Sequence, residues 1–404
     1  MKLNSETCHF IRLHARDDVH TLALQTPQPG VDLEAAIIQI AGRQALAGKV
    51  PSWTAHEDLL FPTRLPLEQC SSEATARYKA EVVRNCGGVR KRMADLTGGL
   101  GVDCAFLAPL FEQVDYVERQ EGLCNLARHN FTALGLTHIN VHLAQAEEIL
   151  SQTQGIDWIY LDPARRDGHG GKTVAIAHCE PDATQLEPLM LDKAPHVLLK
   201  LSPMLDLAQA LQELKHVASA HVVAVDNECK ELLLVLERGC NTEAGDVPIS
   251  CINLSGRNDA PQPNAFLFTR NEERTSPCPL AEKPQTYLYE PHAALLKAGA
   301  FRRITQVCRM QKLHPNSHLY TSDHLVEDFP GRIFCIQGWS GFGKKELKTL
   351  LGPEKRANLS VRNFPATVAE LRKRLHLADG GETYLFATTL SAGEKVLIRT
   401  VKAR

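Results

Sequence analysis

Between residues 90 and 237, short apolar runs alternate with amphipathic stretches, and this alternation limits the fold more than any other feature. The runs are 92–96, 114–118, 139–143, 158–161, 197–201, 221–225 and 232–236. Strands that alternate with helices form parallel β-α-β units, in which helices cover both faces of the sheet. The sequence therefore predicts an α/β fold with a Rossmann-like sheet of seven strands.

The last two of these runs need a different connection from the others. Residues 226–231 lie between them and are too few to form a helix. A short return joins antiparallel neighbours, so we expect the final strand to run antiparallel at that edge of the sheet. Glu228 and Glu231 flank the return, and we expect them to line the mouth of a substrate site.

The flanking regions have other patterns. Residues 1–88 read as helical, with an apolar stripe over 32–46 and a second helix that starts at the N-cap Ser72. The polar segment 241–286 is rich in Pro, Gly, Asn and Glu and predicts a linker or hairpin extension after a sheet domain at 89–240. A mixed α+β region follows, which we divide into 287–330 and 331–404.

Composition excludes several protein classes. The 404 residues are 44% hydrophobic and 23% charged, which is typical of a globular chain, and the length suggests two or three domains. No apolar run reaches the roughly 18 residues of a membrane helix. The first residues lack the apolar segment of a secretory signal, so we expect a cytoplasmic protein without a membrane partner.

The net charge of −2 hides an asymmetry along the chain. Residues 331–404 hold 14 Lys and Arg against 6 Asp and Glu, a net charge of +8, and the remainder carries −10. Clustered basic side chains attract the phosphates of nucleic acids, although a merely solvated basic surface has the same composition. The charge pattern is thus compatible with a polyanionic partner at one end of the chain.

The twelve cysteines do not predict a metal site. Zinc ligands come in closely spaced pairs on turns, and this chain has no Cys-x-x-Cys pair. Most of the cysteines lie in apolar segments, as Cys104 and Cys335 do. We therefore interpret them as reduced thiols and expect no metal.

A glycine-rich turn after the first strand is the strongest candidate for a ligand site. The strand ends in Asp95, and Thr97, Gly98, Gly99 and Gly101 lead from it into a helix. Glycine lets a backbone approach a ligand closely and adopt positive φ. The next strand ends in an acid, Glu118, and an acid at that place can bind both hydroxyls of a ribose.

Charge distinguishes between the two cofactors that such a turn could bind. A dinucleotide site requires G-x-G-x-x-G, but Cys104 stands where the third glycine is needed. The carboxylate of Asp95 would repel a pyrophosphate and suits the ammonium of an amino-acid moiety. S-adenosylmethionine has that ammonium, a ribose and no phosphate. The pattern therefore favours S-adenosylmethionine over NAD.

The fourth strand runs into Asp162, Pro163, Ala164, Arg165 and Arg166. Ligands of open α/β sheets bind beyond the carboxyl ends of the strands, which places Asp162 and Pro163 beside the cofactor. This segment resembles the Asp/Asn-Pro-Pro-Tyr/Phe loop of class I methyltransferases that act on amino groups. The resemblance implies a catalytic role for Asp162, Pro163 and Arg165, although alanine and arginine replace the second proline and the aromatic residue. Arg165 and Arg166 are candidates for binding substrate phosphates or for a surface ion pair.

Two other strands also end at the edge of the sheet where we expect the cofactor to bind. Gln145 and Ala146 follow the third strand, where related enzymes use an acid to bind the adenine amino group; the amide oxygen of Gln145 can accept the same hydrogen bond. Lys200, at the end of the fifth strand, is a candidate for binding a substrate phosphate or carboxylate, or simply a lysine that extends from the strand end into solvent.

The whole chain resembles class I methyltransferases that carry an N-terminal helical region, a ferredoxin-like segment at 287–330 and a C-terminal THUMP-like domain at 331–404. The segments that carry the resemblance are 49–53, 69–73, 95–103, 161–166, 200–203, 289–292, 319–322, 329–332, 362–365 and 379–385. Because THUMP domains bind tRNA, the resemblance implies a methyltransferase that modifies a base of tRNA or rRNA. It also implies Arg362, Arg372, Lys373 and Arg374 as candidates for phosphate contacts.

Two alternative functions stay open from the sequence. One is an RNA-binding or assembly protein that retains a methyltransferase fold without turnover, which the unusual Gln145 and the missing aromatic residue after Pro163 suggest. The other is an NAD-dependent oxidoreductase.

Overall fold

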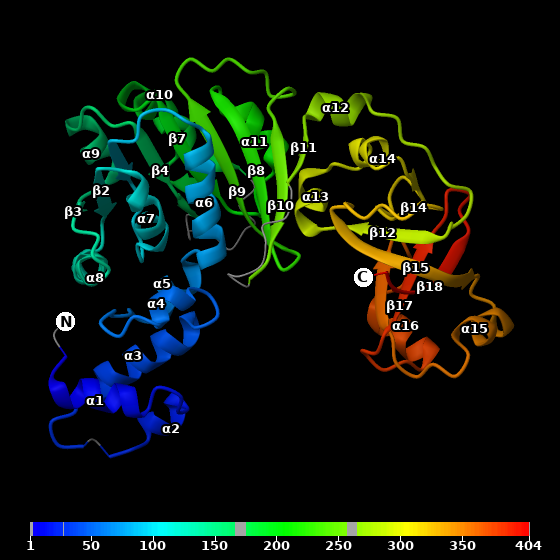
Figure 1. Ribbon diagram of the computed structural model, residues 1–404, viewed down its shortest axis with the longest axis horizontal. Coiled ribbons are helices and arrows are strands. Elements are labelled where there is room, and N and C mark those ends of the chain that lie inside the picture. The colour runs from blue at the N-terminus through cyan, green and yellow to red at the C-terminus, as the bar shows by residue number, and fades with distance from the viewer. Residues whose placement is uncertain (1–2, 27, 166–174, 257–264, 404) are drawn as a thin grey trace. The chain divides into compact units, whose positions relative to one another are not determined.

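The computed structural model describes residues 3–26, 28–165, 175–256 and 265–403. Within those ranges the chain forms two compact units. The first comprises the residues up to 226 with 230–244 and 254–256, and the second comprises 227–229, 245–253 and 265–403. Figure 1 shows the elements of each unit, coloured along the chain.

The N-terminal part of the first unit is helical, as its sequence predicts. Its helices are α1 (Ser5–Leu13), α2 (Val19–Ala23), α3 (Leu33–Leu46), α4 (Pro51–Thr54), α5 (Arg64–Gln69) and α6 (Glu73–Asn85). Asn4, Asp18, Asp32 and Ser72 each start a helix by accepting a hydrogen bond from the backbone N–H three residues later. The apolar stripe of α3 packs through Ala36 and Ile40 against α1 and α2.

All seven predicted strands are present, but the sheet is larger than the sequence predicts. They are β1 (Arg92–Asp95), β2 (Gln113–Glu118), β3 (Ile139–Leu143), β4 (Trp158–Leu161), β7 (His196–Leu201), β8 (Val217–Val225) and β9 (Glu228–Glu237). In the described residues the sheet has nine strands, in the order β11-β10-β8-β9-β7-β4-β1-β2-β3. The added β10 (Ile249–Leu254) and β11 (Phe266–Phe268) pair antiparallel and come from the segment 241–286, for which the sequence predicts a linker or a hairpin extension.

The direction of β9 is as predicted, but its place in the sheet is not. β9 pairs antiparallel with β7, whereas β1, β2, β3, β4 and β7 pair in parallel. The strand order places β9 between β7 and β8 rather than at an edge. Asp226 and Asn227 make the turn with φ of 49° and 66°, a conformation that these two residue types tolerate. The turn brings β9 directly beside β8, and β9 then takes the position next to β7.

The helices of the sheet domain follow the strands, as β-α-β units require. They are α7 (Val102–Leu107), α8 (Glu121–Ala133), α9 (Ala146–Gln152), α10 (Ala183–Lys193) and α11 (Leu207–Glu213), with short 3-10 turns at Ala108–Leu110 and Ile176–His178. Helix α6 also lies on this sheet, beside α7 (Figure 1). The Tyr78 hydroxyl of α6 meets His221 Nδ1 of β8 at 2.9 Å. The N-terminal helices are thereby joined to the sheet that carries the glycine turn.

The second unit contains another mixed sheet. Its strands are β12 (Tyr287–Pro291), β13 (Gln311–Lys312), β14 (Tyr320–Ser322), β15 (Gly331–Ser340), β16 (Asn358–Arg362), β17 (Thr383–Thr389) and β18 (Lys395–Lys402). Among the described residues these form one sheet, in the order β13-β14-β12-β15-β18-β17-β16. The helices are α12 (Arg270–Thr275), α13 (Ala293–Ala298), α14 (Arg303–Val307), α15 (Lys344–Leu351) and α16 (Val368–Leu375). The segments 287–330 and 331–404 thus share one sheet.

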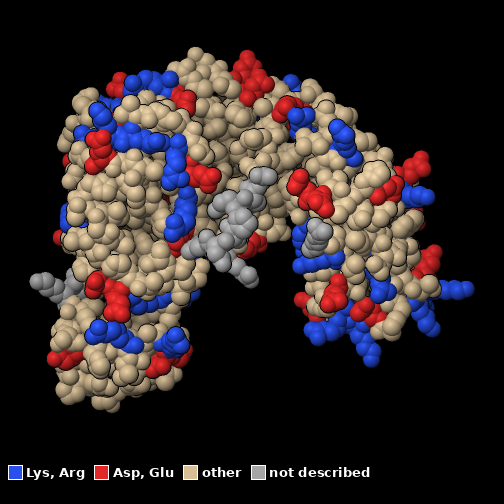
Figure 2. All heavy atoms as spheres, viewed as in Figure 1, with Lys and Arg blue, Asp and Glu red and all other residues tan. Residues whose placement is uncertain are grey.

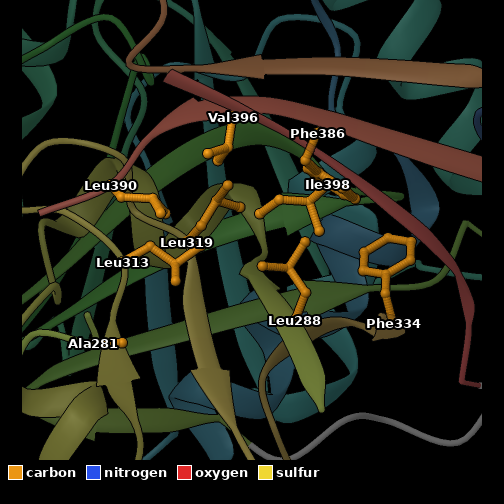
Figure 3. Close-up of a cluster of buried hydrophobic side chains, with 9 residues drawn as sticks. All are labelled: Ala281, Leu288, Leu313, Leu319, Phe334, Phe386, Leu390, Val396 and Ile398. Carbon is orange, nitrogen blue, oxygen red and sulfur yellow. The ribbon is translucent and has the colours of Figure 1, made fainter. Parts of the chain in front are cut away.

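Alternating residues of this sheet enter two different cores. Phe386 and Ile398 join a cluster with Leu288 and Phe334, which Figure 3 shows. Their neighbours on the other face of β17 and β18 pack against α15 and α16, as Leu397 does. Because successive side chains of a strand point to opposite faces, each face of this sheet carries its own apolar core.

Two further findings concern membranes and metals. None of the helices in the described ranges has the length and apolar character that crossing a membrane would need. The same ranges hold no group of three His, Cys, Asp or Glu side chains placed to bind a metal ion.

Candidate active site

The turn after β1 uses its glycines in different ways. Gly98 donates its N–H to the carbonyl of Val117 at 2.9 Å, and a Cβ here would lie 2.3 Å from the Tyr116 ring. Gly99 and Gly101 have φ of 56° and 85°, in the left-handed region that favours glycine. Gly98 thus makes room for Tyr116, and the other two glycines allow the chain to turn into α7.

Asp95 and Thr97 connect this turn to the end of β4. The Thr97 N–H donates to Asp95 Oδ1 at 3.0 Å, and the Thr97 hydroxyl accepts the Asp162 N–H at 2.7 Å. Asp95 is only 1% exposed. Burial, followed by the nearby charges of Asp103, Asp162 and Glu118, raises the pKa of Asp95 well above its ordinary value. A cation bound beside this carboxyl would therefore be stabilised when Asp95 ionises.

Glu118 ends β2 and faces the same turn. Its Oε2 accepts the Gly99 N–H at 2.9 Å, and its Oε1 accepts the Gln120 N–H at 2.8 Å. These two bonds fix the carboxylate, and each oxygen retains a second lone pair for a hydroxyl donor. The geometry suits a ribose diol at the end of β2.

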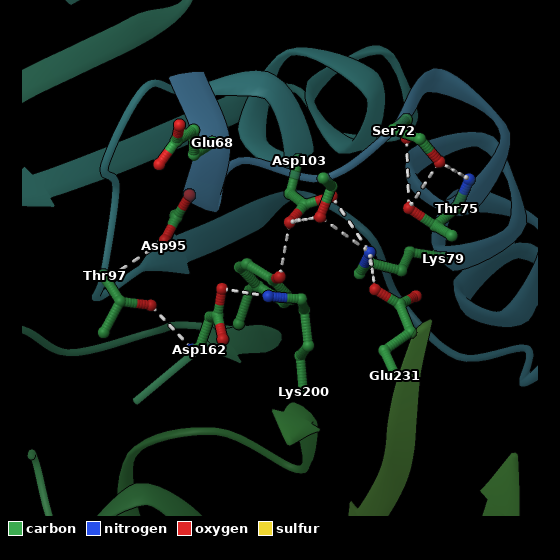
Figure 4. A network of polar contacts seen from close by, with 12 residues as sticks. Glu68, Ser72, Thr75, Lys79, Asp95, Thr97, Asp103, Asp162, Lys200 and Glu231 are labelled. Carbon is green, nitrogen blue, oxygen red and sulfur yellow. Dashed lines mark hydrogen bonds and ion pairs between the residues drawn. The ribbon is translucent and has the colours of Figure 1, made fainter. Parts of the chain in front are cut away.

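Asp162 lies where the sequence predicts, beyond the end of β4, and its carboxylate is held from the neighbouring strand. Lys200 Nζ, on β7, donates to Asp162 Oδ2 (Figure 4). The side chain of Asp162 is 33% exposed and that of Lys200 is 15% exposed. Burial alone would lower the pKa of Lys200, but the carboxylates of Asp162, Asp103 and Glu231 outweigh it and raise the pKa above its ordinary value. Lys200 is thus a cation that orients Asp162.

Pro163, Ala164 and Arg165 follow Asp162 in the same loop. Pro163 is buried, and Ala164–Arg165 form the short strand β5, which pairs with β6 (Cys179–Glu180). Arg166 lies outside the described residues.

Sequence reasoning missed a buried ionic cluster beneath the Asp162 loop. Lys79 of α6 has a fully buried side chain, and its Nζ lies 3.1 Å from Asp103 Oδ1 and 2.7 Å from Glu231 Oε2 (Figure 4). Ser71 and Tyr160 each donate a hydroxyl to Asp103 Oδ2 at 2.7 Å. We name Ser71, Lys79, Asp103, Tyr160 and Glu231 the Lys79 cluster. It links α6, α7, β4 and β9 and lies within reach of Lys200.

The pKa values of the two acids of the Lys79 cluster are shifted in opposite directions. Burial raises the pKa of Asp103, but Lys79, Lys200 and the two hydroxyl donors outweigh it, so the net shift is downward. For Glu231, burial is the largest influence and the charge of Asp103 adds to it, so its pKa is raised despite the two lysines. Glu231 is 2% exposed, which corrects the expectation that it lines the substrate mouth. The apolar strand around it carries Glu231 into the core.

A signal for Lys79 is present in the sequence. Lys79 stands three and four positions before Val82 and Val83 and so falls on the apolar stripe of its helix. A charged residue on a buried stripe needs an ionic partner, because its desolvation is otherwise unfavourable. The pattern does not tell which acid is that partner, since Glu231 lies on a distant strand.

The third strand end carries the other predicted cofactor residues. Gln145 is exposed and precedes α9, and Ala146 is the buried first residue of that helix. A cavity of about 590 Å³ opens at the next residue of α9, Glu147, and is otherwise lined by residues 180–182 and by Gln185 and Leu186. The structure thus has a hollow between the start of α9 and the start of α10.

The basic residues predicted to contact phosphate in the second unit differ in availability. Arg362 donates to Glu290 Oε1 at 2.9 Å, and Glu290 also binds Arg332. Arg372 pairs with Asp379. Lys373 and Arg374 are exposed, and Arg374 lies over the Phe342 ring. Arg362, Arg372 and Arg374 therefore have structural partners, Arg374 also through a hydrogen bond of 3.3 Å to the Phe342 carbonyl, whereas Lys373 is exposed.

Comparison with known proteins adds the family. Residues 287–330 match a ferredoxin-like domain family, and residues 331–402 match a THUMP domain-like family. A crystal structure from Porphyromonas gingivalis W83, of a protein assigned as a methyltransferase, is 37% identical to the chain; the match covers 100% of both chains, with a TM-score of 0.88. No curated protein sequence matches the chain.

Two more solved structures match part of the chain. An rRNA methylase from Streptococcus thermophilus is 16% identical over 40% of this chain and 94% of its own, with a TM-score of 0.30. TrmK from M. capricolum, solved with S-adenosyl-homocysteine, is 12% identical over 41% of this chain and 70% of its own, with a TM-score of 0.31.

The family follows from the match over the full length. The Porphyromonas gingivalis protein shares more than a third of its residues with this chain from end to end, and the two C-terminal families match at 287–330 and 331–402, where the sequence predicts a ferredoxin-like segment and a THUMP-like domain. The chain belongs to the class I methyltransferase family that carries a ferredoxin-like segment and a C-terminal THUMP-like domain.

Proposed function

We propose that the protein is an S-adenosylmethionine-dependent methyltransferase that modifies a base of structured RNA. The observation that carries this proposal is the pair of acids at the glycine turn, Asp95 and Glu118, which suits a cationic nucleoside better than a pyrophosphate. When bound, S-adenosylmethionine supplies an electrophilic methyl group on a positively charged sulfur. The five-part division of the chain at residues 88, 240, 286 and 330 is part of the same proposal.

The residues that would hold the cofactor follow from their positions. Asp95 would face the ammonium, Glu118 the ribose hydroxyls, and Gln145 the adenine amino group beside the hollow at α9. Gly99 and Gly101 would let the backbone lie close to the ligand. Thr97 contacts both Asp95 and Asp162, and Ala146 follows Gln145 as the first residue of α9.

The catalytic work of the chain is orientation. Asp162 would accept a hydrogen bond from the substrate N–H, and its carboxylate is held for that purpose by Lys200 while its backbone N–H is held by Thr97. A methyl transfer to a correctly placed lone pair needs little acid catalysis, so proximity and alignment supply most of the rate. In this scheme Lys200 is a positioning residue.

A methyl-transfer assay tests the proposed function. Labelled methyl donor is incubated with the protein and total RNA, and the RNA is fractionated by size and then by nucleoside. The expected result is label in one RNA size class and one modified nucleoside. Label in protein or small molecules but not in RNA would contradict the RNA part of the proposal.

One observation favours a second candidate, a methyltransferase fold without turnover. Asp162 is already engaged by Lys200, so the carboxylate that would receive a substrate is partly satisfied. Saturable binding of S-adenosylmethionine without methyl incorporation into any RNA would support this candidate. Binding of NAD in place of S-adenosylmethionine would instead support the oxidoreductase.

Gly98→Ala tests the shape of the turn. The added Cβ would lie 2.3 Å from the Tyr116 ring, and the hydroxyl of that ring donates to the Gly99 carbonyl at 2.6 Å. Overpacking of this kind lowers the free energy of unfolding by about 1–3 kcal/mol, and because the clash displaces the turn that would hold the cofactor, we expect weaker binding of S-adenosylmethionine in calorimetry. Gly122→Ala is the matched control, because nothing lies within 4 Å of a Cβ there. Equal affinities in the two variants would contradict the assignment.

The raised pKa of Asp95 predicts how the affinity for the cofactor depends on pH. Because the pKa of Asp95 is raised, chiefly by burial, the free protein retains this proton to a higher pH than an ordinary aspartate does. A bound ammonium favours the ionised carboxylate, so binding releases a proton, and affinity rises with pH until the raised pKa is passed. The test runs below about pH 7, where an α-amino group of pKa about 7.7–8.0 stays charged.

Calorimetry in two buffers of different ionisation heat measures the proton release. Asp95→Asn should bind more weakly and without this dependence. An affinity of the unaltered protein that stays constant over the range would place the ammonium elsewhere.

A further inference from the structure

A groove in the THUMP-like domain has features that the methyl-transfer site does not explain. It lies between β15 and α15 and has a volume of about 670 Å³, within the about 300–1,000 Å³ of small-ligand pockets. Its lining consists of residues 337–340 of β15, Lys345, Glu346, Thr349 and Leu350 of α15, and Arg399 of β18.

The strand that forms one wall of the groove is irregular at this point. The pairing of β15 with β18 shifts between Ile336 and Gly338, so Gln337 is an extra residue. A bulge of this kind re-aims the side chains around it, and such bulges are frequent next to functional sites. Gln337 and Trp339 are both exposed and both line the groove.

Trp339 differs from the other tryptophans of the chain. Its exposed fraction is 36%, whereas Trp53 is 2% and Trp158 is 1% exposed. The indole of Trp339 is therefore available on the surface of the groove, where every nucleobase has a flat face that can stack on an aromatic ring.

The charges around the groove are mostly positive. On α15, Lys344, Lys345 and Lys348 are exposed, and Figure 2 shows Lys and Arg gathered where α15 and α16 lie. The acid of the same helix, Glu346, accepts the Gly343 N–H at 3.1 Å and so is directed to its own helix start. Arg399 donates to the Leu350 carbonyl at 3.0 Å and forms an ion pair with Glu354 at 3.3 Å, so among the described residues the unpaired positive charge here belongs to the lysines of α15. The surroundings thus attract an anion.

We propose that this groove binds one unpaired nucleotide of RNA: Trp339 stacks on the base, Gln337 and Ser340 contact the base edge, and Lys345 contacts the phosphate. Amide and hydroxyl groups both donate and accept hydrogen bonds, as a base edge requires. The inference rests on the RNA part of the proposed function and names the surface that holds the RNA. The basic surroundings favour RNA over a peptide segment as the occupant.

The test uses the full chain and a short, fluorescently labelled single-stranded RNA of mixed sequence, without methyl donor. Loss of one base–aromatic stack is worth about 1–3 kcal/mol, so Trp339→Ala should weaken binding about 5- to 150-fold, whereas Trp339→Phe should stay close to the unaltered protein. Lys345→Ala should reduce the slope of log affinity against log salt by about 1. Lys355→Ala, an exposed lysine outside the groove, should bind like the unaltered protein.

Intrinsic fluorescence supplies a second readout. RNA should change the tryptophan emission of the unaltered protein but not that of Trp339→Phe, which retains only the buried Trp53 and Trp158. If Trp339→Ala binds RNA as tightly as the unaltered protein, the groove proposal fails, even where methyl transfer to RNA occurs. If the unaltered protein binds no RNA, both this proposal and the RNA substrate fail. Tight binding of a peptide in the groove instead of RNA would also overturn it.

Discussion

Asp162→Ala is expected to lower kcat by about 10²–10⁴-fold, the range found for removing a group that positions or accepts a reacting proton. Asp162 lies beyond β4, held by Lys200 and through its N–H by Thr97, so its carboxylate can face the substrate. Binding of S-adenosylmethionine should stay within about tenfold, or about 1.4 kcal/mol, because the cofactor contacts come mainly from the turn after β1 and from Glu118.

Two measurements separate the explanations for this loss. Single-turnover methyl transfer reports the chemical step, and calorimetry reports cofactor binding. Lys200→Arg is a conservative companion that keeps a cation beside Asp162 and should retain more activity than Lys200→Met. Equal loss of turnover and of cofactor binding in Asp162→Ala would assign Asp162 to cofactor binding alone.

Lys79→Met is expected to lower the free energy of unfolding by about 3–5 kcal/mol, the effect of removing one partner from a buried ion pair. The side chain of Lys79 is fully buried between Asp103 and Glu231, and its removal would leave their negative charge without a compensating ion at 2.7–3.1 Å. Urea unfolding followed by far-ultraviolet circular dichroism measures the change.

A double variant and a matched control make this prediction sharper. Lys79→Met with Glu231→Leu should recover part of the lost stability, since two apolar side chains replace the Lys79–Glu231 ion pair and only Asp103 is left without Lys79. Arg84→Met removes an exposed cation from the same helix and should change stability by no more than about 0.5 kcal/mol. If Lys79→Met is as stable as Arg84→Met, the Lys79 cluster does not hold α6 to the sheet.

Much of the first sheet could be predicted because its signals are local. The seven strands follow from apolar runs bounded by turns, and the glycine turn follows from residues that tolerate positive φ, as Gly101 does. The helix that begins after Ser72 follows from a side chain that caps it. Each of these depends on neighbours within a few residues.

The place of β9 and the two added strands could not be predicted in the same way. Strand neighbours are chosen by packing and by hydrogen bonds between segments far apart in the chain, and the sequence between Asp226 and Glu228 specifies only a turn. The composition of 241–286 is compatible with a linker or a hairpin extension, and only the pairing of strands decides that β10 and β11 extend the first sheet. The bulge at Gln337 also depends on a partner strand, because it exists only relative to the register of β18.

The sequence by itself determined the strands, the helix starts, the glycine turn and the order of the acids that follow the strands, since these depend on backbone preferences and on the alternation of apolar residues. Only the tertiary structure decided that Lys200 holds Asp162, that Lys79 meets Glu231, 152 positions further along the chain, and that Trp339 lines a groove. The physical reason is that a charge or an aromatic ring acquires its role from what surrounds it in space. Burial and distance to a partner are properties of the packed chain and not of any local pattern.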